Sequence, residues 1–141
     1  MRYLKLSLLL FALANAQNIF AQKKAKHNIV FQFTNGNDTL QQKAFVKQLE
    51  NITEYWPQAN YEVVIYNQGV ELVFGTNNNY HDRLLALKQK GIQFVVCENT
   101  LKNRKITKES LQQDIIGYVP AGIAEIVLKQ EKGWSYIKGG F

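Results

Sequence analysis

Residues 91–104 read GIQFVVCENTLKNR, an apolar run followed directly by a polar and basic segment. The run at 94–97 lacks the alternation of a half-exposed strand and is typical of a strand that is covered on both faces. Gly91 follows a helical pattern and precedes the run, at the position where a left-handed residue commonly ends a helix. This stretch therefore predicts a helix that ends at Gly91 and a buried strand that ends at Cys97.

Further strands and helices alternate on either side of this stretch. Residues that favour strands enrich four other segments, at 27–33, 61–66, 115–119 and 134–137. Apolar residues at three- and four-residue steps predict helices at 39–56, 80–90 and 120–130. A short helix is expected from about Thr107, and Thr39 and Gln42 have the spacing of a capping box. Five strands separated by helical segments predict an α/β fold with a parallel sheet and helices on both faces, because right-handed crossovers force that layering.

The composition describes one near-neutral globular domain behind a basic N-terminus. The 141 residues include 17 Lys+Arg and 11 Asp+Glu, for a net charge of +6. Five of the basic residues come early in the chain: Arg2, Lys5, Lys23, Lys24 and Lys26. The remaining 12 basic and 11 acidic residues nearly cancel, so no nucleic-acid partner is predicted. A hydrophobic fraction of 46% excludes a disordered chain, and the length suits one domain.

The first 21 residues have the three parts of a secretory signal peptide. A basic start precedes an apolar run at 6–14, and small residues provide two candidate cleavage sites, after Ala16 and after Ala21. The run is too short to span a bilayer, which takes about 20 residues. We expect a periplasmic or secreted protein with no membrane partner after cleavage, in which a basic tether at 22–26 leads to a single domain at 27–141.

Cys97 is the candidate nucleophile because it is the only cysteine in the chain and ends a buried strand. Ligands of parallel sheets usually bind beyond the carboxyl ends of the strands. Asn99 and Thr100 are expected to cap a helical turn whose N–H groups stabilise a thiolate, and Arg104 and Lys105 add positive potential. The competing interpretation is a free cysteine that belongs to the core. A single cysteine allows neither an intrachain disulfide nor a four-cysteine zinc site.

A second candidate site is the segment at 34–39, between a predicted strand and a predicted helix. It faintly resembles the phosphate loop of flavodoxins, in which backbone N–H groups, here around Asn35 and Gly36, cradle a phosphate; the alternative is a turn and helix cap. His81 is either an acid–base group or a solvated residue of a first helical turn. The sequence shows no serine–histidine–aspartate, paired-carboxylate or metal-ligand pattern, so neither a cofactor nor a metal is predicted.

Three segments together resemble the DsrE/DsrF-like family: 91–106, 119–125 and 133–138. The resemblance covers about 27–138 and is most specific in the apolar strand that ends in Cys97, with Asn-Thr-Leu and basic residues behind it. It implies a three-layer α/β/α domain with a five-stranded parallel sheet and the strand order 4-3-2-1-5. It also implies assembly as homotrimers or homohexamers.

The same resemblance implies a function for Cys97. In sulfur-relay members of the family the strand-end cysteine carries sulfur as a persulfide, which passes from a donor protein to an acceptor protein. Arg104 and Lys105 would steady the anionic sulfur or a partner's carboxylates. The expected function is therefore sulfur transfer or sensing through Cys97 in the periplasm. The alternative is a non-catalytic periplasmic binding or assembly module in which Cys97 is structural.

Overall fold

The structure is a computed structural model that describes residues 27–75 and 79–141. The predicted signal peptide and tether lie outside these residues. Five strands form one parallel sheet: β1 (Asn28–Phe33), β2 (Asn60–Ile65), β3 (Ile92–Cys97), β4 (Ile116–Val119) and β5 (Ser135–Lys138). The α-helices are α2 (Thr39–Tyr55), α3 (His81–Gln89), α4 (Glu98–Arg104) and α5 (Gly122–Glu131), and two 3-10 helices are η1 (Asn67–Val73) and η2 (Lys108–Ser110). None of the described helices is both long and apolar enough to cross a membrane.

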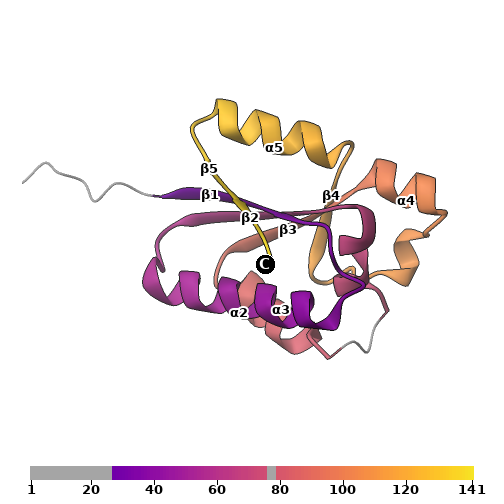
Figure 1. Cartoon of the computed structure of the whole chain (residues 1–141), viewed down its shortest axis with the longest axis horizontal. Helices are drawn as coiled ribbons and strands as arrows, with labels where there is room; N and C mark the ends of the chain where they lie inside the picture. The colour runs from indigo at the N-terminus through magenta and orange to yellow at the C-terminus, as the bar shows by residue number, and fades with distance from the viewer. Residues whose placement is uncertain (1–26, 76–78) are drawn as a thin grey trace, which may run out of the picture.

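The connections between strands put helices on both faces of the sheet (Figure 1). The strand order is β4-β3-β2-β1-β5, so β1 to β4 are added in one direction, and α2 and α3 cover one face. The last connection runs back from β4 to the opposite edge at β5, and its helix α5 covers the other face. Right-handed crossovers require this change of face when the direction of strand addition reverses. The predicted three-layer α/β/α domain, its parallel sheet and its strand order are confirmed.

The two faces of the sheet carry cores of different size. Under α2 and α3 the core is extensive and contains the stacked rings of Phe33 and Phe45, whose centroids lie 4.3 Å apart. Under α5 the buried apolar cluster has three members in the described part of the chain: Val30, Val64 and Ile126. Because side chains alternate along a strand, Cys97 lies on the α5 face of β3 together with Val95. The candidate thiol is therefore on the thinly covered side of the sheet.

The start of α2 differs from the sequence prediction. Asp38 is the N-cap residue, and its carboxylate accepts hydrogen bonds from the backbone N–H groups of Leu40, at 2.8 Å, and Gln41, at 3.3 Å. The predicted capping box of Thr39 and Gln42 is therefore wrong, because Thr39 is already the first residue of the helix. Both Asp and Thr favour the N-cap position, and the sequence alone does not rank two such neighbours.

The segment after Cys97 also folds differently from the prediction. It forms α4 at once, whereas the short helix expected from about Thr107 is a single 3-10 turn, η2. The one buried residue of α4 is Leu101, which is 4% exposed and joins the larger core. Gly91 follows α3 with a φ of +99°, which confirms the left-handed residue predicted at the end of that helix.

Candidate functional site

The sulfur of Cys97 lies where two helix N-termini meet. Cys97 ends β3 and is the N-cap residue of α4, and it is 6% exposed. The groups that lower the pKa of its thiol are the backbone N–H groups of Gly122, Thr100 and Asn99 and the Thr100 hydroxyl. The N–H of Asn99 also donates to the Pro120 carbonyl oxygen at 3.3 Å. Gly122 is the first residue of α5, and Asn99 and Thr100 belong to the first turn of α4. Asn99 and Thr100 were expected to act as caps; Cys97 itself occupies the N-cap position, and these two residues supply N–H groups.

These donors change the acidity of the thiol. Burial raises the pKa of the Cys97 thiol, but the N–H of Gly122 and then the N–H and hydroxyl of Thr100 lower it by more. The pKa of Cys97 therefore lies below its ordinary value. Hydrogen bonds to a charged group favour the charged form, and a larger thiolate fraction makes a cysteine a better nucleophile near neutral pH.

The approach of α5 to the sulfur depends on a glycine. A Cβ atom on Gly122 would lie 3.2 Å from the Cβ of Cys97, 3.2 Å from the Cδ1 of Tyr66 and 3.2 Å from the Cγ1 of Val64. These distances are shorter than ordinary van der Waals contacts, so a side chain at this position would push the helix or its neighbours apart. The N-cap residue of α5, Ala121, has no side chain that could accept from the N–H groups of the first turn, and the N–H of Gly122 lowers the pKa of Cys97.

The basic residues behind Cys97 are turned to other partners. Arg104 donates from Nη2 to the Glu71 carboxylate at 2.6 Å, and Lys108 donates to Glu98 at 2.6 Å. Lys105 ends α4 in a left-handed conformation with a φ of 54° and is exposed. Two of the four basic residues at 102–108 are thus paired with carboxylates.

The segment that contains Asn35 and Gly36 is a packing junction. Asn35 is exposed and Gly36 is buried. A Cβ atom on Gly36 would lie 2.5 Å from the carbonyl oxygen of Gln68 and 2.8 Å from that of Gly69. Glycine is therefore needed where the loops after β1 and β2 touch, and the groups that face it are carbonyl oxygens, which repel a phosphate.

His81 belongs to a separate cluster. Its ring nitrogens lie 3.2 Å from Asp82 Oδ1 and 2.9 Å from Asp114 Oδ2, so it joins the start of α3 to the loop before β4. Hydrogen bonds that the His81 ring donates to Asp82 and then to Asp114 raise the pKa of His81. In the described residues no group of three or more His, Cys, Asp and Glu side chains is arranged to hold a metal ion.

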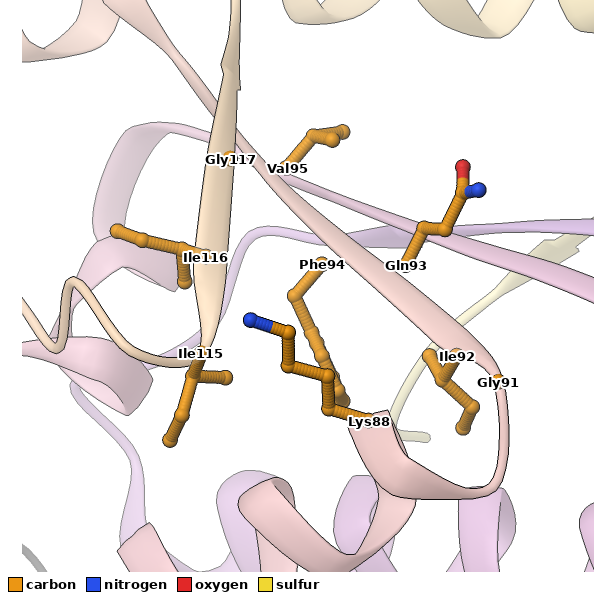
Figure 2. A pocket seen from close by; sticks show the side chains of 9 residues that line it. All are labelled: Lys88, Gly91, Ile92, Gln93, Phe94, Val95, Ile115, Ile116 and Gly117. Atoms are coloured by element: carbon orange, nitrogen blue, oxygen red, sulfur yellow. The ribbon is translucent and has the colours of Figure 1, made fainter.

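A pocket of about 490 Å³ lies along the first half of β3, beside the start of β4 (Figure 2). The side chain of Lys88 extends into it, and the Lys88 ammonium donates to the Asp114 carbonyl oxygen at 2.5 Å. None of the residues proposed for the site from the sequence lines this pocket. The candidate thiol lies away from this pocket, at the carboxyl end of β3.

Comparison with known proteins adds a family to this geometry. The model of the DsrE/DsrF-like family matches residues 27–138. The chain belongs to the DsrE/DsrF-like family. This is a family of the sulfur-relay type, and the match confirms the resemblance seen in the sequence. A search of curated proteins found no match.

Two solved structures share the DsrE/DsrF-like fold of this chain. A protein of unknown function from Methanobacterium thermoautotrophicum is 25% identical, with a TM-score of 0.74 over 80% of this chain and 99% of that one. A conserved protein of unknown function from Bacteroides thetaiotaomicron is 15% identical, with a TM-score of 0.62 over 79% of this chain and 93% of that one. The second likeness shows the fold alone.

Sequence reasoning missed Tyr66, which lies beside Cys97 in this DsrE/DsrF-like domain. Ile65 pairs with Val96, so the next residues of the two strands, Tyr66 and Cys97, are neighbours on the α5 face. Gln32 forms a hydrogen bond with the Tyr66 side chain, and Tyr136 donates to Gln32 Oε1. Burial, together with the charges of Tyr136 and Cys97, raises the pKa of Tyr66. The available signal was the position of Tyr66 at the end of a strand, one residue beyond an apolar run.

Proposed function

We propose that this protein carries sulfane sulfur as a persulfide on Cys97. The observation that supports this most directly is the position of Cys97 at the end of β3 and the start of α4, where the N–H groups of Gly122 and Thr100 and the Thr100 hydroxyl lower the pKa of its thiol. These donors favour the thiolate of the only cysteine in the chain, and the thiolate is the reactive form in sulfur exchange. Membership of the DsrE/DsrF-like family supports the same chemistry.

The proposed reaction has two steps and needs no external oxidant or reductant. The Cys97 thiolate attacks the terminal sulfur of a donor persulfide; a new S–S bond forms at Cys97, the S–S bond of the donor breaks, and the donor leaves as a thiolate. An acceptor thiolate then attacks the terminal sulfur on Cys97, and the Cys97 thiolate leaves. The N–H groups of Gly122, Thr100 and Asn99 stabilise Cys97 both as nucleophile and as leaving group, because both are the same thiolate.

We also propose the setting in which this chemistry takes place. The signal-like segment at 1–21 supports export to the periplasm or beyond, where sulfur donor and acceptor proteins would be the partners. Family membership supports assembly as a homotrimer or homohexamer. Cell fractionation tests the first point, and a monomeric mass in light scattering would contradict the second.

The second candidate function is a non-catalytic binding or assembly module. The low exposure of Cys97, 6%, favours it, because a buried thiol often serves only to fill the core. In this case the hydrogen bonds at the sulfur would fix the junction of α4 and α5 without any exchange of sulfur.

Mass spectrometry after incubation with inorganic polysulfide separates the two functions. The carrier function predicts that the wild-type protein gains the mass of one sulfur atom, that dithiothreitol removes it, and that Cys97→Ser prevents it. A control at equal protein concentration in denaturant shows whether the thiol was available for reaction. A wild-type protein whose free thiol is intact but which gains no sulfur would refute the carrier function and leave the structural one.

A further inference from the structure

The backbone of Asn67 is held by α4 from two sides. Asn67 follows β2 and has a φ of 52°, in the left-handed region that residues other than glycine seldom adopt. Its N–H donates to Thr100 Oγ1 at 3.1 Å, and its carbonyl oxygen accepts from Arg104 Nη1 at 3.0 Å. Both partners belong to α4, the helix that begins at Cys97. The loop after β2 is thus tied to the helix that carries the thiol.

The bond from Asn67 leaves the Thr100 hydroxyl hydrogen available to the sulfur. A threonine hydroxyl has one hydrogen to donate and two lone pairs that accept. One lone pair accepts the N–H of Asn67. Thr100 is the third residue after Cys97, in the first turn of α4, and its hydroxyl is among the groups that lower the pKa of the Cys97 thiol. Since the thiolate can only accept, the single hydrogen is the one directed at the sulfur, and the N–H of Asn67 helps to hold the hydroxyl in this orientation.

Arg104 holds the peptide that orients this hydroxyl. Its guanidinium donates to the Asn67 carbonyl from Nη1 and to Glu71 Oε1 from Nη2, at 2.6 Å. The planar guanidinium presents both N–H groups in a fixed geometry, which an ammonium does not reproduce. The side chains of Arg104 and Glu71 are 33% and 34% exposed, so part of this contact is shielded from water.

We propose that Arg104 is a positioning residue that directs the Thr100 hydroxyl at the Cys97 sulfur by holding the backbone of Asn67. The proposal gives Arg104 a role other than direct contact with anionic sulfur. It rests on the proposed function in one respect, that the thiolate of Cys97 is the reactive group. The groups that lower the pKa of Cys97 belong to α4 and α5, and the loop after β2 acts on the sulfur through Thr100.

The pH profile of Cys97 alkylation by iodoacetamide tests the chain of contacts. Thr100→Val removes the hydroxyl at nearly constant shape and is expected to slow alkylation at neutral pH roughly tenfold, because a hydrogen bond to a charged group is lost. Arg104→Lys keeps the charge but loses the planar guanidinium, and is expected to slow alkylation roughly threefold to tenfold. In both variants the midpoint of the profile moves to higher pH. Thr100→Ser retains the hydroxyl and restores the wild-type profile.

A double variant decides whether Arg104 acts through Thr100. Arg104→Lys added to Thr100→Val is expected to cause no further change, whereas an independent effect of Arg104 on the sulfur would add to that of Thr100. Lys102→Gln, which removes an exposed charge from the same helix, is the matched control and leaves the midpoint unchanged. A midpoint in Arg104→Lys equal to that of the control, or additive shifts in the double variant, would overturn the proposal. Alkylation requires no sulfur donor. A failure of persulfide loading would therefore count against the proposed function, and not against the contacts that lead from Arg104 through Asn67 and Thr100 to Cys97.

Discussion

Replacement of Gly122 by alanine tests the close approach of α5 to Cys97. The new Cβ would lie 3.2 Å from each of three side-chain atoms, on Cys97, Tyr66 and Val64. The neighbours must therefore give way by a few tenths of an ångström. Because α5 is the only described helix over this face of the sheet, and its buried apolar contacts are few, we expect the helix N-terminus to move rather than the strands.

Two effects of opposite sign determine the stability of Gly122→Ala. Crowding in a packed site costs about 1–3 kcal/mol. Alanine stabilises a helix interior over glycine by up to about 1 kcal/mol, and less at the first position. The net loss in the free energy of unfolding is therefore about 0–3 kcal/mol. The pKa of the Cys97 thiol is expected only to rise, because the distance between the Gly122 N–H and the sulfur becomes longer. Alkylation at neutral pH should therefore slow roughly threefold to tenfold.

Urea denaturation and the pH profile of alkylation measure these two quantities. Gly117→Ala is the matched control, because a Cβ atom on Gly117 has its nearest neighbours at 3.9 Å and Gly117 is exposed on β4. The control should leave the alkylation profile unchanged. If Gly122→Ala keeps both the stability and the alkylation profile of the wild type, then the N–H of Gly122 does not control the thiol, and the assignment of α5 to the site is wrong.

Two further predictions concern ion pairs. Lys129 Nζ lies 2.5 Å from Glu62 Oε2, and Glu62 is 3% exposed, so Lys129→Met leaves a buried carboxylate unpaired and is expected to lower the free energy of unfolding by about 3–5 kcal/mol. The double variant Glu62→Leu/Lys129→Met should recover most of that loss in urea denaturation, and a double variant as unstable as the single one would contradict this reasoning. Arg83 donates two hydrogen bonds to Glu50, and this hydrogen bonding lowers the pKa of Glu50. The pair therefore stabilises the fold at pH values above the ordinary pKa of glutamate, and this stabilisation is lost as the pH falls through the lowered pKa. Arg83→Met should therefore cost about 0.2–1 kcal/mol at neutral pH and less in acid, and an equal loss at both pH values would show that packing, not charge, is responsible.

The position of the thiol could be predicted from the sequence because it depends on strong local signals. The apolar run before Cys97 is long enough to identify a buried strand, and Gly91 marks where the preceding helix stops. For the helix after Cys97 the cap-forming residues Asn99 and Thr100 predicted a turn but not its length, since Leu101 is its only buried residue and one apolar position defines no period. The direction of the Arg104 side chain was beyond sequence reasoning for a different reason. Its partners, Asn67 and Glu71, come from the loop after another strand, and only the tertiary structure brings them near.

Contacts across the thinly covered face were also beyond reach of the sequence. Glu62 lies among Tyr61, Val63 and other apolar residues of β2, and its alternation with Val64, and with Tyr66 just after the strand, places it on the α5 side. The pattern does not indicate that Lys129 of α5 pairs with Glu62, nor that Gly122 of the same helix lies against Tyr66. Both contacts depend on where the last helix crosses the sheet, which no local pattern specifies.

The connection from β4 to β5 explains why α5 reaches the sulfur at all. β4 and β5 are at opposite edges of the sheet, so the helix between them must cross over β3, β2 and β1. A parallel crossover leaves a strand at its carboxyl end, and β4 ends beside β3, with Val119 paired to Cys97. The first turn of α5 is thereby brought to the end of the strand that carries the thiol, and a glycine at its start lets the N–H approach. The acidity of Cys97 is in this sense a consequence of strand order: with β5 next to β4, the last helix would not have to cross the sheet over β3, and α4 alone would surround the sulfur.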